Sequence, residues 1–300
     1  IKALARPQKL ALLAAARRPH KAAVRAAGAL LLAALAAGSA FAVPIFDKEG
    51  AVSLAGASPQ SFTFAVPATF TYPVRMFYMT AVSSASPHAN FGTQVLSANS
   101  ADGRAWAPEA GTRISTGSQT AVSASSITGC AVLPLSGGGF RMLYSIKSTT
   151  GAFRIHSTTS ADGLIWGDHT TTAVDGVASF VGVPRLVTLN SGDWRLYYTA
   201  DQNGGDELSD RRLFTARSTD EGATWGVPSQ ALAVSTITYE SGVSKLFDGR
   251  IRLFFTQPVG GVSSATVVSS ALSDSLGATF ALETGLRLAT TTADGGMAFP

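Results

Sequence analysis

The chain has 300 residues, with 30 glycines and 13 prolines but only 14% charged residues. This composition is typical of short strands joined by turns, and it argues against a mostly helical protein. Seven of the 23 basic residues precede residue 42, so 16 basic and all 19 acidic residues lie after it. Since the chain after residue 42 is therefore mildly acidic, its charge does not indicate a nucleic-acid partner.

Residues 1–42 have the features of a cleavable signal peptide. Their charged residues are all basic, an apolar run covers residues 26–37, and the small residues Ser39, Ala40 and Ala42 lead to an expected cleavage site before Val43. The apolar run is shorter than the roughly 20 residues that span a bilayer. We therefore predict a secreted or periplasmic protein, not an integral membrane protein, with one domain over residues 43–300.

A strand pattern recurs four times after residue 43. In each copy an arginine is followed by aromatic and aliphatic residues, which is typical of a buried β-strand. The copies cover residues 74–78, 140–144, 194–198 and 251–255, with Arg75, Arg141, Arg195 and Arg252 at the shared position. In the last three copies an apolar stretch and then a glycine precede the arginine, which predicts two strands joined by a turn.

A second pattern follows each arginine strand and combines serine, aspartate and glycine with an aromatic residue. Serine and aspartate side chains can bond nearby backbone amides, glycine permits a positive φ, and the aromatic ring can pack between neighbouring units. The structural residues of this pattern are Ser100, Asp102 and Trp106; Ser160, Asp162 and Trp166; Ser218, Asp220, Gly222 and Trp225; and Gly277 and Phe280. Copies recur every 55 to 60 residues in step with the strand pattern, which predicts one repeat per blade of a β-propeller.

The third copy, residues 218–225, resembles the Asp-box (BNR) motif of sialidases and related propellers at every position. The first two copies are one residue shorter and also resemble the repeats of five-bladed glycoside hydrolases and of their non-catalytic relatives. The resemblance implies an all-β propeller of five or six four-stranded blades, with five favoured. About four blades fit within residues 43–300, so we expect the propeller to be incomplete at its C-terminus. The resemblance also implies that the aspartates of the turns are structural and lie away from the active-site face.

By the same resemblance, a ligand site lies on the face that carries the loops into the inner strand of each blade and the loops between its second and third strands. Aligning the repeats on their glycines puts Glu240 at this level, where a carboxylate could serve as acid, base or nucleophile. Glycoside hydrolysis needs two carboxyl groups about 5–10 Å apart. Candidates for the second are Asp175 and Asp294, each before an inner strand, and the acids of the polar loop, Asp201, Asp206, Glu207 and Asp210. The alternative is that Glu240 pairs with an arginine or caps a strand. Candidate substrate-binding residues are Tyr239, Arg185 and Asp206.

Two functions stay open on the sequence. Sialidases grip their substrate with three arginines, whereas here the repeated arginines share one strand position and only Arg185 is placed to reach the site, so the resemblance does not extend to sialidase chemistry. The chain is expected to be either a glycoside hydrolase acting on a glycan or a non-catalytic propeller that binds glycan or protein. We expect no cofactor and no metal site from cysteine or histidine spacing, although the polar loop at residues 201–210 could hold a structural Ca²⁺ ion.

Overall fold

The computed structural model describes residues 53–54, 59–65, 74–80, 92–118, 124–171, 174, 181–182, 184–201, 211–232, 239–259, 262–285 and 287–289. The chain divides into residues 1–46 and residues 47–300, and all described residues belong to the second unit. The predicted signal peptide therefore lies outside the described residues. Within the described ranges, no helix has the length and hydrophobicity needed to cross a membrane.

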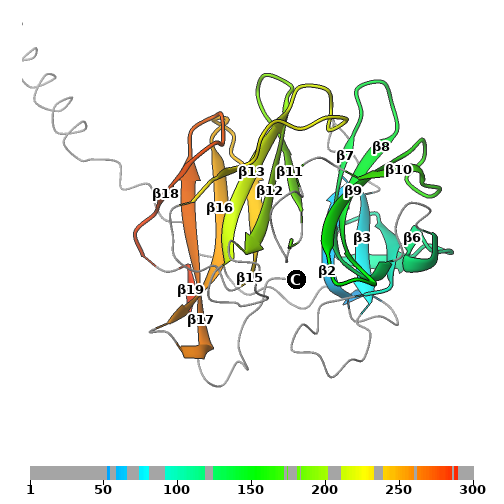
Figure 1. Cartoon of the computed structure of the whole chain (residues 1–300), viewed down its shortest axis with the longest axis horizontal. Helices are drawn as coiled ribbons and strands as arrows, with labels where there is room; N and C mark the ends of the chain where they lie inside the picture. Colours follow the sequence, from blue (N-terminus) through cyan, green and yellow to red (C-terminus); the bar gives the residue numbers. More distant parts are fainter. Residues whose placement is uncertain are drawn as a thin grey trace, which may run out of the picture. The chain divides into compact units, whose positions relative to one another are not determined.

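The described residues fold into four antiparallel sheets, each with four strands in consecutive order (Figure 1). Blade 1 contains β2 (Pro59–Ala65), β3 (Val74–Thr80), β4 (Gln94–Ser100) and β5 (Ala105–Pro108). Blade 2 contains β7 (Ala124–Pro134), β8 (Phe140–Ser148), β9 (Phe153–Ser160) and β10 (Gly167–Thr171). Blade 3 contains β11 (Arg185–Thr188), β12 (Trp194–Asp201), β13 (Arg211–Ser218) and β14 (Ser229–Gln230). Blade 4 contains β15 (Tyr239–Lys245), β16 (Ile251–Val259), β17 (Val262–Ser273) and β18 (Phe280–Leu282).

Short elements extend the sheets of blades 1 and 4. In blade 1, β1 (Ser53–Leu54) pairs in parallel with β5, and β6 (Ile114–Ser115) pairs with β4 before the 3-10 helix η1 (Thr116–Ser118). In blade 4, β19 (Leu288–Ala289) pairs with β17. The prediction of an all-β propeller is confirmed, and four of its blades are described.

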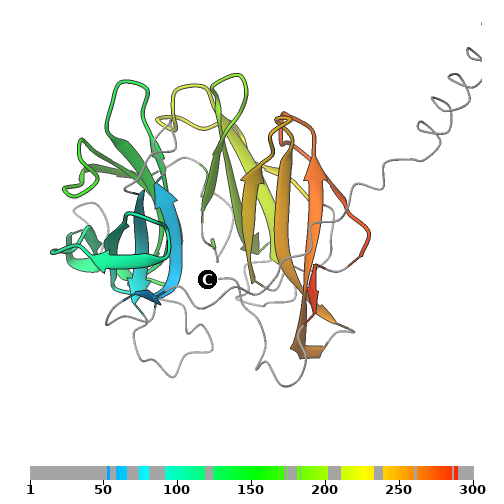
Figure 2. The same ribbon diagram turned by 180° about the vertical axis from the view of Figure 1, so that it is seen from behind.

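The first strand of each blade lies on the inner side of the arc of blades (Figures 1 and 2). Strand β2 contacts β7, β7 contacts β11, and β11 contacts β15, so these four strands follow one another around a common axis. The remaining strands of each blade lie progressively further from that axis. The inner strands are therefore the elements that position any axial site.

Hydrophobic layers between successive blades hold the sheets together. Tyr144 of β8 packs with Phe77 of blade 1, whereas its neighbour Leu143 packs with Leu196 of blade 3. Successive side chains of a strand point to opposite faces, so a strand buried on both faces must be apolar at nearly every position. This requirement explains why each arginine strand reads as a continuous aromatic and aliphatic run.

We predict that Leu143→Ala lowers the free energy of unfolding by about 2–5 kcal/mol, because Leu143 is fully buried and its removal leaves a cavity between blades 2 and 3. Urea unfolding followed by tryptophan fluorescence measures the change. Val227→Ala is the control, since Val227 is 93% exposed and its truncation removes no packed side chain. Equal stability of the two variants would show that Leu143 does not contribute to a hydrophobic layer between blades 2 and 3.

Candidate functional site

The candidate site lies at the starts of the inner strands. Tyr239 and Glu240 begin β15, and Arg185 begins β11, and these two strands are in contact. The structure therefore brings together the strands that carry three of the six predicted site residues. The other three, Asp175, Asp206 and Asp294, lie outside the described residues.

A β-bulge contains Glu240. In the pairing of β15 with β16, Tyr239 lies opposite Thr256, and Gly242 lies opposite Phe254, so β15 holds one extra residue over this interval. A bulge interrupts the strict alternation of side chains along a strand and re-aims those at the bulge, and bulges are frequent beside active sites. Glu240 therefore occupies a position where the backbone departs from regular strand geometry.

Blade 2 carries a bulge at the same level. There Ile127 lies opposite Ile146 and Gly129 opposite Ser145, which leaves Thr128 as the extra residue. Ser145 is equivalent to Thr256 of blade 4, because each stands four residues after the arginine of its strand. The sequence alignment that put Glu240 level with Gly129 therefore agrees with the strand pairing to within one residue.

A buried hydroxyl group lies beside each of these bulges. In blade 2 the hydroxyl groups of Thr128 and Ser145 form a short hydrogen bond, and both side chains are buried. In blade 4 the equivalent Thr256 is fully buried, and its hydroxyl has no hydrogen-bond partner in the part of the chain that the structure describes. A buried hydroxyl group thus lies next to both inner-strand bulges.

Arg185 lies near the thiol of Cys130 on β7. Burial raises the pKa of Cys130 to about 12, and the positive charge of Arg185 acts in the opposite direction. A thiol with this pKa is protonated at neutral pH and is neither a nucleophile nor a metal ligand. Cys130 is therefore a core residue, and Arg185 is a half-buried cation at the start of β11.

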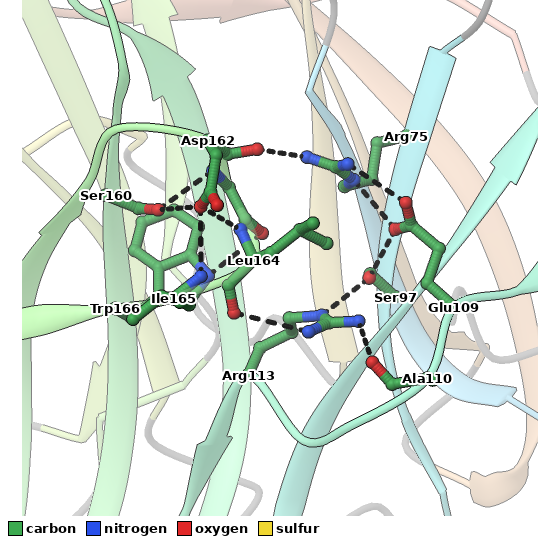
Figure 3. Close-up of polar contacts among 11 residues, drawn as sticks. Arg75, Ser97, Glu109, Ala110, Arg113, Ser160, Asp162, Leu164, Ile165 and Trp166 are labelled. Atoms are coloured by element: carbon green, nitrogen blue, oxygen red, sulfur yellow. Dashed lines mark hydrogen bonds and ion pairs between the residues drawn. The ribbon is translucent and has the colours of Figure 1, made fainter.

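The Ser-x-Asp turns are closed by their own side chains, as Figure 3 shows for blade 2. Ser160 Oγ accepts a hydrogen bond from the amide of Gly163 (2.8 Å). Asp162 Oδ1 accepts from the amides of Leu164 (2.8 Å) and Ile165 (3.0 Å). These bonds from Ile165 and Leu164 lower the pKa of Asp162 to about 2, so the carboxylate is ionised and directed at its own backbone. The same bonds form around Ser100 and Asp102 in blade 1.

The turn of blade 3 accommodates one more residue than the first two. Ser218 Oγ accepts from the amide of Gly222 (2.7 Å), and Asp220 accepts from both the amide and the hydroxyl of Thr224 (2.9 and 2.6 Å). The extra residue, Glu221, adopts a φ of 54°, and its carboxylate accepts a hydrogen bond from the amide of Ser136 in blade 2 (2.9 Å). The longer turn thus makes an additional contact with the preceding blade.

The aromatic residues of the turns pack against the preceding blade. Trp166 forms an edge-to-face contact with Phe77 of blade 1, with ring centroids 5.7 Å apart. Phe280 forms a similar contact with Tyr197 of blade 3, with ring centroids 5.5 Å apart. The turns therefore form part of the interfaces between successive blades, and we call these turn-to-blade contacts joints.

The repeated arginines also contact these joints. Arg75 Nη1 of blade 1 donates to the carbonyl of Asp162 in blade 2 (2.6 Å). A Cβ at Gly222 would lie 3.1 Å from Cδ of Arg141, and a Cβ at Gly277 would lie 3.4 Å from Cδ of Arg195, so each arginine packs closely against the turn of the next blade. The shared position of the arginines therefore has a structural basis.

We predict that Asp220→Ala lowers the Tm by about 3–6 °C without affecting any activity, because three hydrogen bonds that close the turn are lost. Differential scanning calorimetry measures the change. Asp248→Ala is the matched control, because Asp248 is an exposed turn aspartate whose carboxylate bonds the amide and the side chain of Arg250 within its own hairpin and contacts no other blade in the described ranges. A Tm of the Asp220 variant equal to that of the control would show that the turn is closed by other contacts.

His156 is a buried histidine that the sequence patterns did not single out. It is fully buried on β9, directly opposite Tyr144, whose hydroxyl bonds Nδ1 of His169 (2.9 Å). Neither ring nitrogen of His156 has a hydrogen-bond partner among the described residues. Burial, together with the charges of His169 and Arg154, lowers the pKa of His156 to about 4, so the imidazole is neutral at pH 7. In the same ranges, no three His, Cys, Asp or Glu side chains converge as metal ligands.

The low pKa of His156 predicts acid sensitivity. The unfolded chain binds a proton near pH 6.5 and the folded chain only near pH 4, so stability is fully present above pH 6.5 and falls as the pH drops toward 4. The loss over this interval amounts to about 3 kcal/mol. In urea unfolding at pH 7.0 and 4.5, His156→Leu should lose less stability on acidification than the wild type. An identical loss in both proteins would assign the acid sensitivity to other groups.

The comparisons with known proteins concern the fold. No protein-family model matches the sequence, and no curated protein matches it. Among solved structures, a thermostable family-43 glycoside hydrolase superposes with a TM-score of 0.57 at 12% identity, covering 77% of this chain and 74% of that one. A levansucrase variant of B. megaterium superposes with a TM-score of 0.59 at 12% identity, covering 83% of this chain and 77% of that one.

An endo-arabinase of Bacteroides thetaiotaomicron is also similar, with a TM-score of 0.50 at 14% identity, covering 71% of this chain and 76% of that one. At these identities the similarity establishes the fold, which is that of propeller glycoside hydrolases. It does not by itself assign an activity to this chain.

Proposed function

We propose that this chain is a secreted propeller protein related to the sialidase (BNR) superfamily and to glycoside hydrolases, and that it hydrolyses a glycan at the axis of the propeller. The observation that carries the proposal is the position of Glu240, in a bulge at the start of the inner strand β15. The similarity of the fold to propeller glycoside hydrolases supports the same reading. Export is proposed from the pattern of residues 1–42.

The proposed chemistry assigns Glu240 as general acid, general base or nucleophile. A glycosidic bond breaks when one carboxyl group protonates the leaving oxygen and a second activates water or attacks the anomeric carbon. Asp175 and Asp294 are proposed for the second carboxyl group because each precedes an inner strand in the sequence pattern. Arg185, Tyr239 and Asp206 are proposed to bind the hydroxyl groups of the sugar.

The activities named for the structurally similar enzymes suggest which substrates to test first. The structurally similar proteins include an endo-arabinase, a β-xylosidase, a family-43 glycoside hydrolase and a levansucrase. We therefore propose arabinan, aryl arabinofuranosides, aryl xylosides and sucrose as first substrates, with a sialoside to test the sialidase relationship. Release of product from one class would establish the activity and name its sugar.

We predict that Glu240→Gln lowers kcat on the active substrate by about 10²–10⁴-fold, because the amide can neither donate nor accept the required proton. The Tm should stay within about 1 °C of the wild type, which shows that the fold is retained. Glu221→Gln is the control, since Glu221 lies in a turn between blades and should retain full turnover. Undiminished turnover of the Glu240 variant would remove this residue from the mechanism.

A second function, glycan binding without catalysis, is favoured by one observation. Among the residues of β2, β7, β11 and β15, Glu240 is the one carboxylate, and hydrolysis needs two. A binding propeller would show no turnover on the panel but would bind one of the same glycans in isothermal titration calorimetry. Such binding, undiminished in the Glu240→Gln variant, would select this second function.

A further inference from the structure

Blades 1 and 4 each contain a tetrad of two arginines, a serine and a glutamate. In blade 1 the tetrad is Arg75, Ser97, Glu109 and Arg113 (Figure 3). Arg75 donates from Nε and Nη2 to the two carboxylate oxygens of Glu109 (2.7 and 2.9 Å). Ser97 Oγ donates to the same carboxylate (2.6 Å) and accepts from Arg113 Nε (2.7 Å). The repeated arginine of blade 1 is thus paired with a carboxylate of its own blade.

The tetrad of blade 4 consists of Arg252, Ser270, Glu283 and Arg287. Arg252 donates from Nε and Nη2 to the carboxylate of Glu283 (3.0 and 2.9 Å). Ser270 Oγ donates to the same carboxylate (2.5 Å), which also forms an ion pair with Nη2 of Arg287 (3.6 Å). In both blades, therefore, the repeated arginine and a serine hydroxyl together bind one carboxylate.

The strand register identifies the equivalent residues of blade 2. In both tetrads the glutamate lies across from the serine, and its amide donates to the serine carbonyl (2.9 Å in each). The serine itself lies opposite the second residue after the repeated arginine. In blade 2 the repeated arginine is Arg141, the residue in the place of the serine is Ser157, and the residue across from Ser157 is Thr170. Blade 2 thus has the arginine and the serine but a short, neutral side chain in place of the glutamate.

Arg141 has no carboxylate partner within the described ranges. Its Nη1 donates to Ser157 Oγ (3.0 Å), and its Nε is buried without a hydrogen bond. Burial lowers the pKa of Arg141, whereas the charges of Asp220 and Glu221 in the turn of blade 3 act in the opposite direction. The carboxylates of that turn accept hydrogen bonds from other groups. The guanidinium of Arg141 is therefore left with a donor for which the described residues supply no acceptor.

The place of the missing glutamate is open to solvent on one side. Ser157 is only 2% exposed, whereas Arg141 is half-buried and Thr170 is exposed on the outer strand β10. A guanidinium N–H that is withdrawn from water needs an acceptor, and a carboxylate matches the paired donors of arginine. Ser157 Oγ accepts from Arg141 and so keeps its own hydrogen for donation. A carboxylate placed as in blades 1 and 4 would accept from both residues.

Blade 3 also lacks the glutamate, but an aspartate lies near its arginine. Ser229 stands at the register position of the glutamate. The carboxylate of Asp193 accepts from Nε of Arg217 (3.0 Å), and Arg217 lies directly opposite the repeated Arg195. The charge of Asp193 also acts on Arg195 itself. Among the described side chains, blade 2 is thus the blade in which no acid of the same blade accompanies the arginine.

We infer that Arg141 and Ser157 form a binding site for the carboxylate group of a ligand, which takes in blade 2 the place that a glutamate takes in blades 1 and 4. The ligand is an organic acid, either a small carboxylate ion or an acidic sugar such as a uronate. The site lies beside the joint of blades 2 and 3, where Cδ of Arg141 packs against Gly222. It does not involve the axial residues, so it is independent of the proposed hydrolase activity.

The test is differential scanning calorimetry of the full-length protein in sodium acetate, sodium galacturonate and sodium chloride at one ionic strength. Acetate at about ten times its Kd should raise the Tm by about 3–6 °C above the value in chloride, because it binds the folded state. Thr170→Glu should raise the Tm in chloride and abolish the acetate effect, since it supplies a carboxylate from the position of the glutamate. Ser229→Glu is the matched control and should keep the acetate effect, because it makes the same change at the equivalent position of blade 3.

The same series separates the two sources of the carboxylate. Equal shifts in acetate and galacturonate would identify a site for small carboxylate ions, and a larger shift in galacturonate would identify a site for an acidic sugar. A galacturonate effect at the propeller axis would persist in Thr170→Glu, which distinguishes it from binding at Arg141.

Three results would overturn the inference. The first is an equal Tm of the wild type in acetate and in chloride, and the second is an acetate effect that is retained in Thr170→Glu. The third is loss of the effect in Ser229→Glu but not in Thr170→Glu, which would place the anion in blade 3. Thr170 is exposed, so its substitution leaves the core unchanged and the test does not require a variant of the half-buried Arg141 to fold.

Discussion

The propeller depends on one interaction: blades 1, 2 and 3 each place an arginine against the turn of the next blade, and a guanidinium withdrawn from water needs acceptors. The turn offers its backbone carbonyls as acceptors, because the side chains of its own serine and aspartate already bond its backbone amides, as those of Ser160 and Asp162 do. Its carbonyls are then free to accept from the neighbouring blade, and the carbonyl of Asp162 accepts from Arg75. The acidic residues of the turns thus act on the adjoining blade through the backbone that they order.

The hydrophobic layers and these polar joints are complementary. The hydrogen bond of Arg75 to the turn links blades 1 and 2, and the rings of Phe77 and Trp166 add an apolar contact between the same two blades. Stacking four sheets in this way brings their first strands together around the axis. Because the strands are buried on both faces, polar chemistry at the axis is confined to strand starts, bulges and loops, which is where Glu240 and Arg185 lie.

Sequence reasoning predicted the repeated elements well because their signals are local. The arginine strands and the turns each lie within a few residues, so hydrophobic pattern and turn chemistry are sufficient to recognise them. The tetrads were missed because their members are far apart: Arg75 and Glu109 are separated by 34 residues, and their pairing follows from the sheet register. The burial of His156 was missed for a similar reason, since its ring packs against Tyr144 of the adjacent strand β8, with ring centroids 5.6 Å apart, and this contact follows from the sheet register.

For the candidate site, the sequence by itself determined which residue types stand at the starts of the inner strands, and it put Glu240 level with Gly129. It also determined the number of repeats and the turn chemistry, because these depend on composition and short-range spacing. Only the tertiary structure decided that Glu240 lies in a bulge, that the strand of Arg185 adjoins that of Glu240, and that Arg75 and Arg113 hold the turn of blade 2. Register and blade packing are long-range properties, since they follow from which strands pair and which faces are buried together.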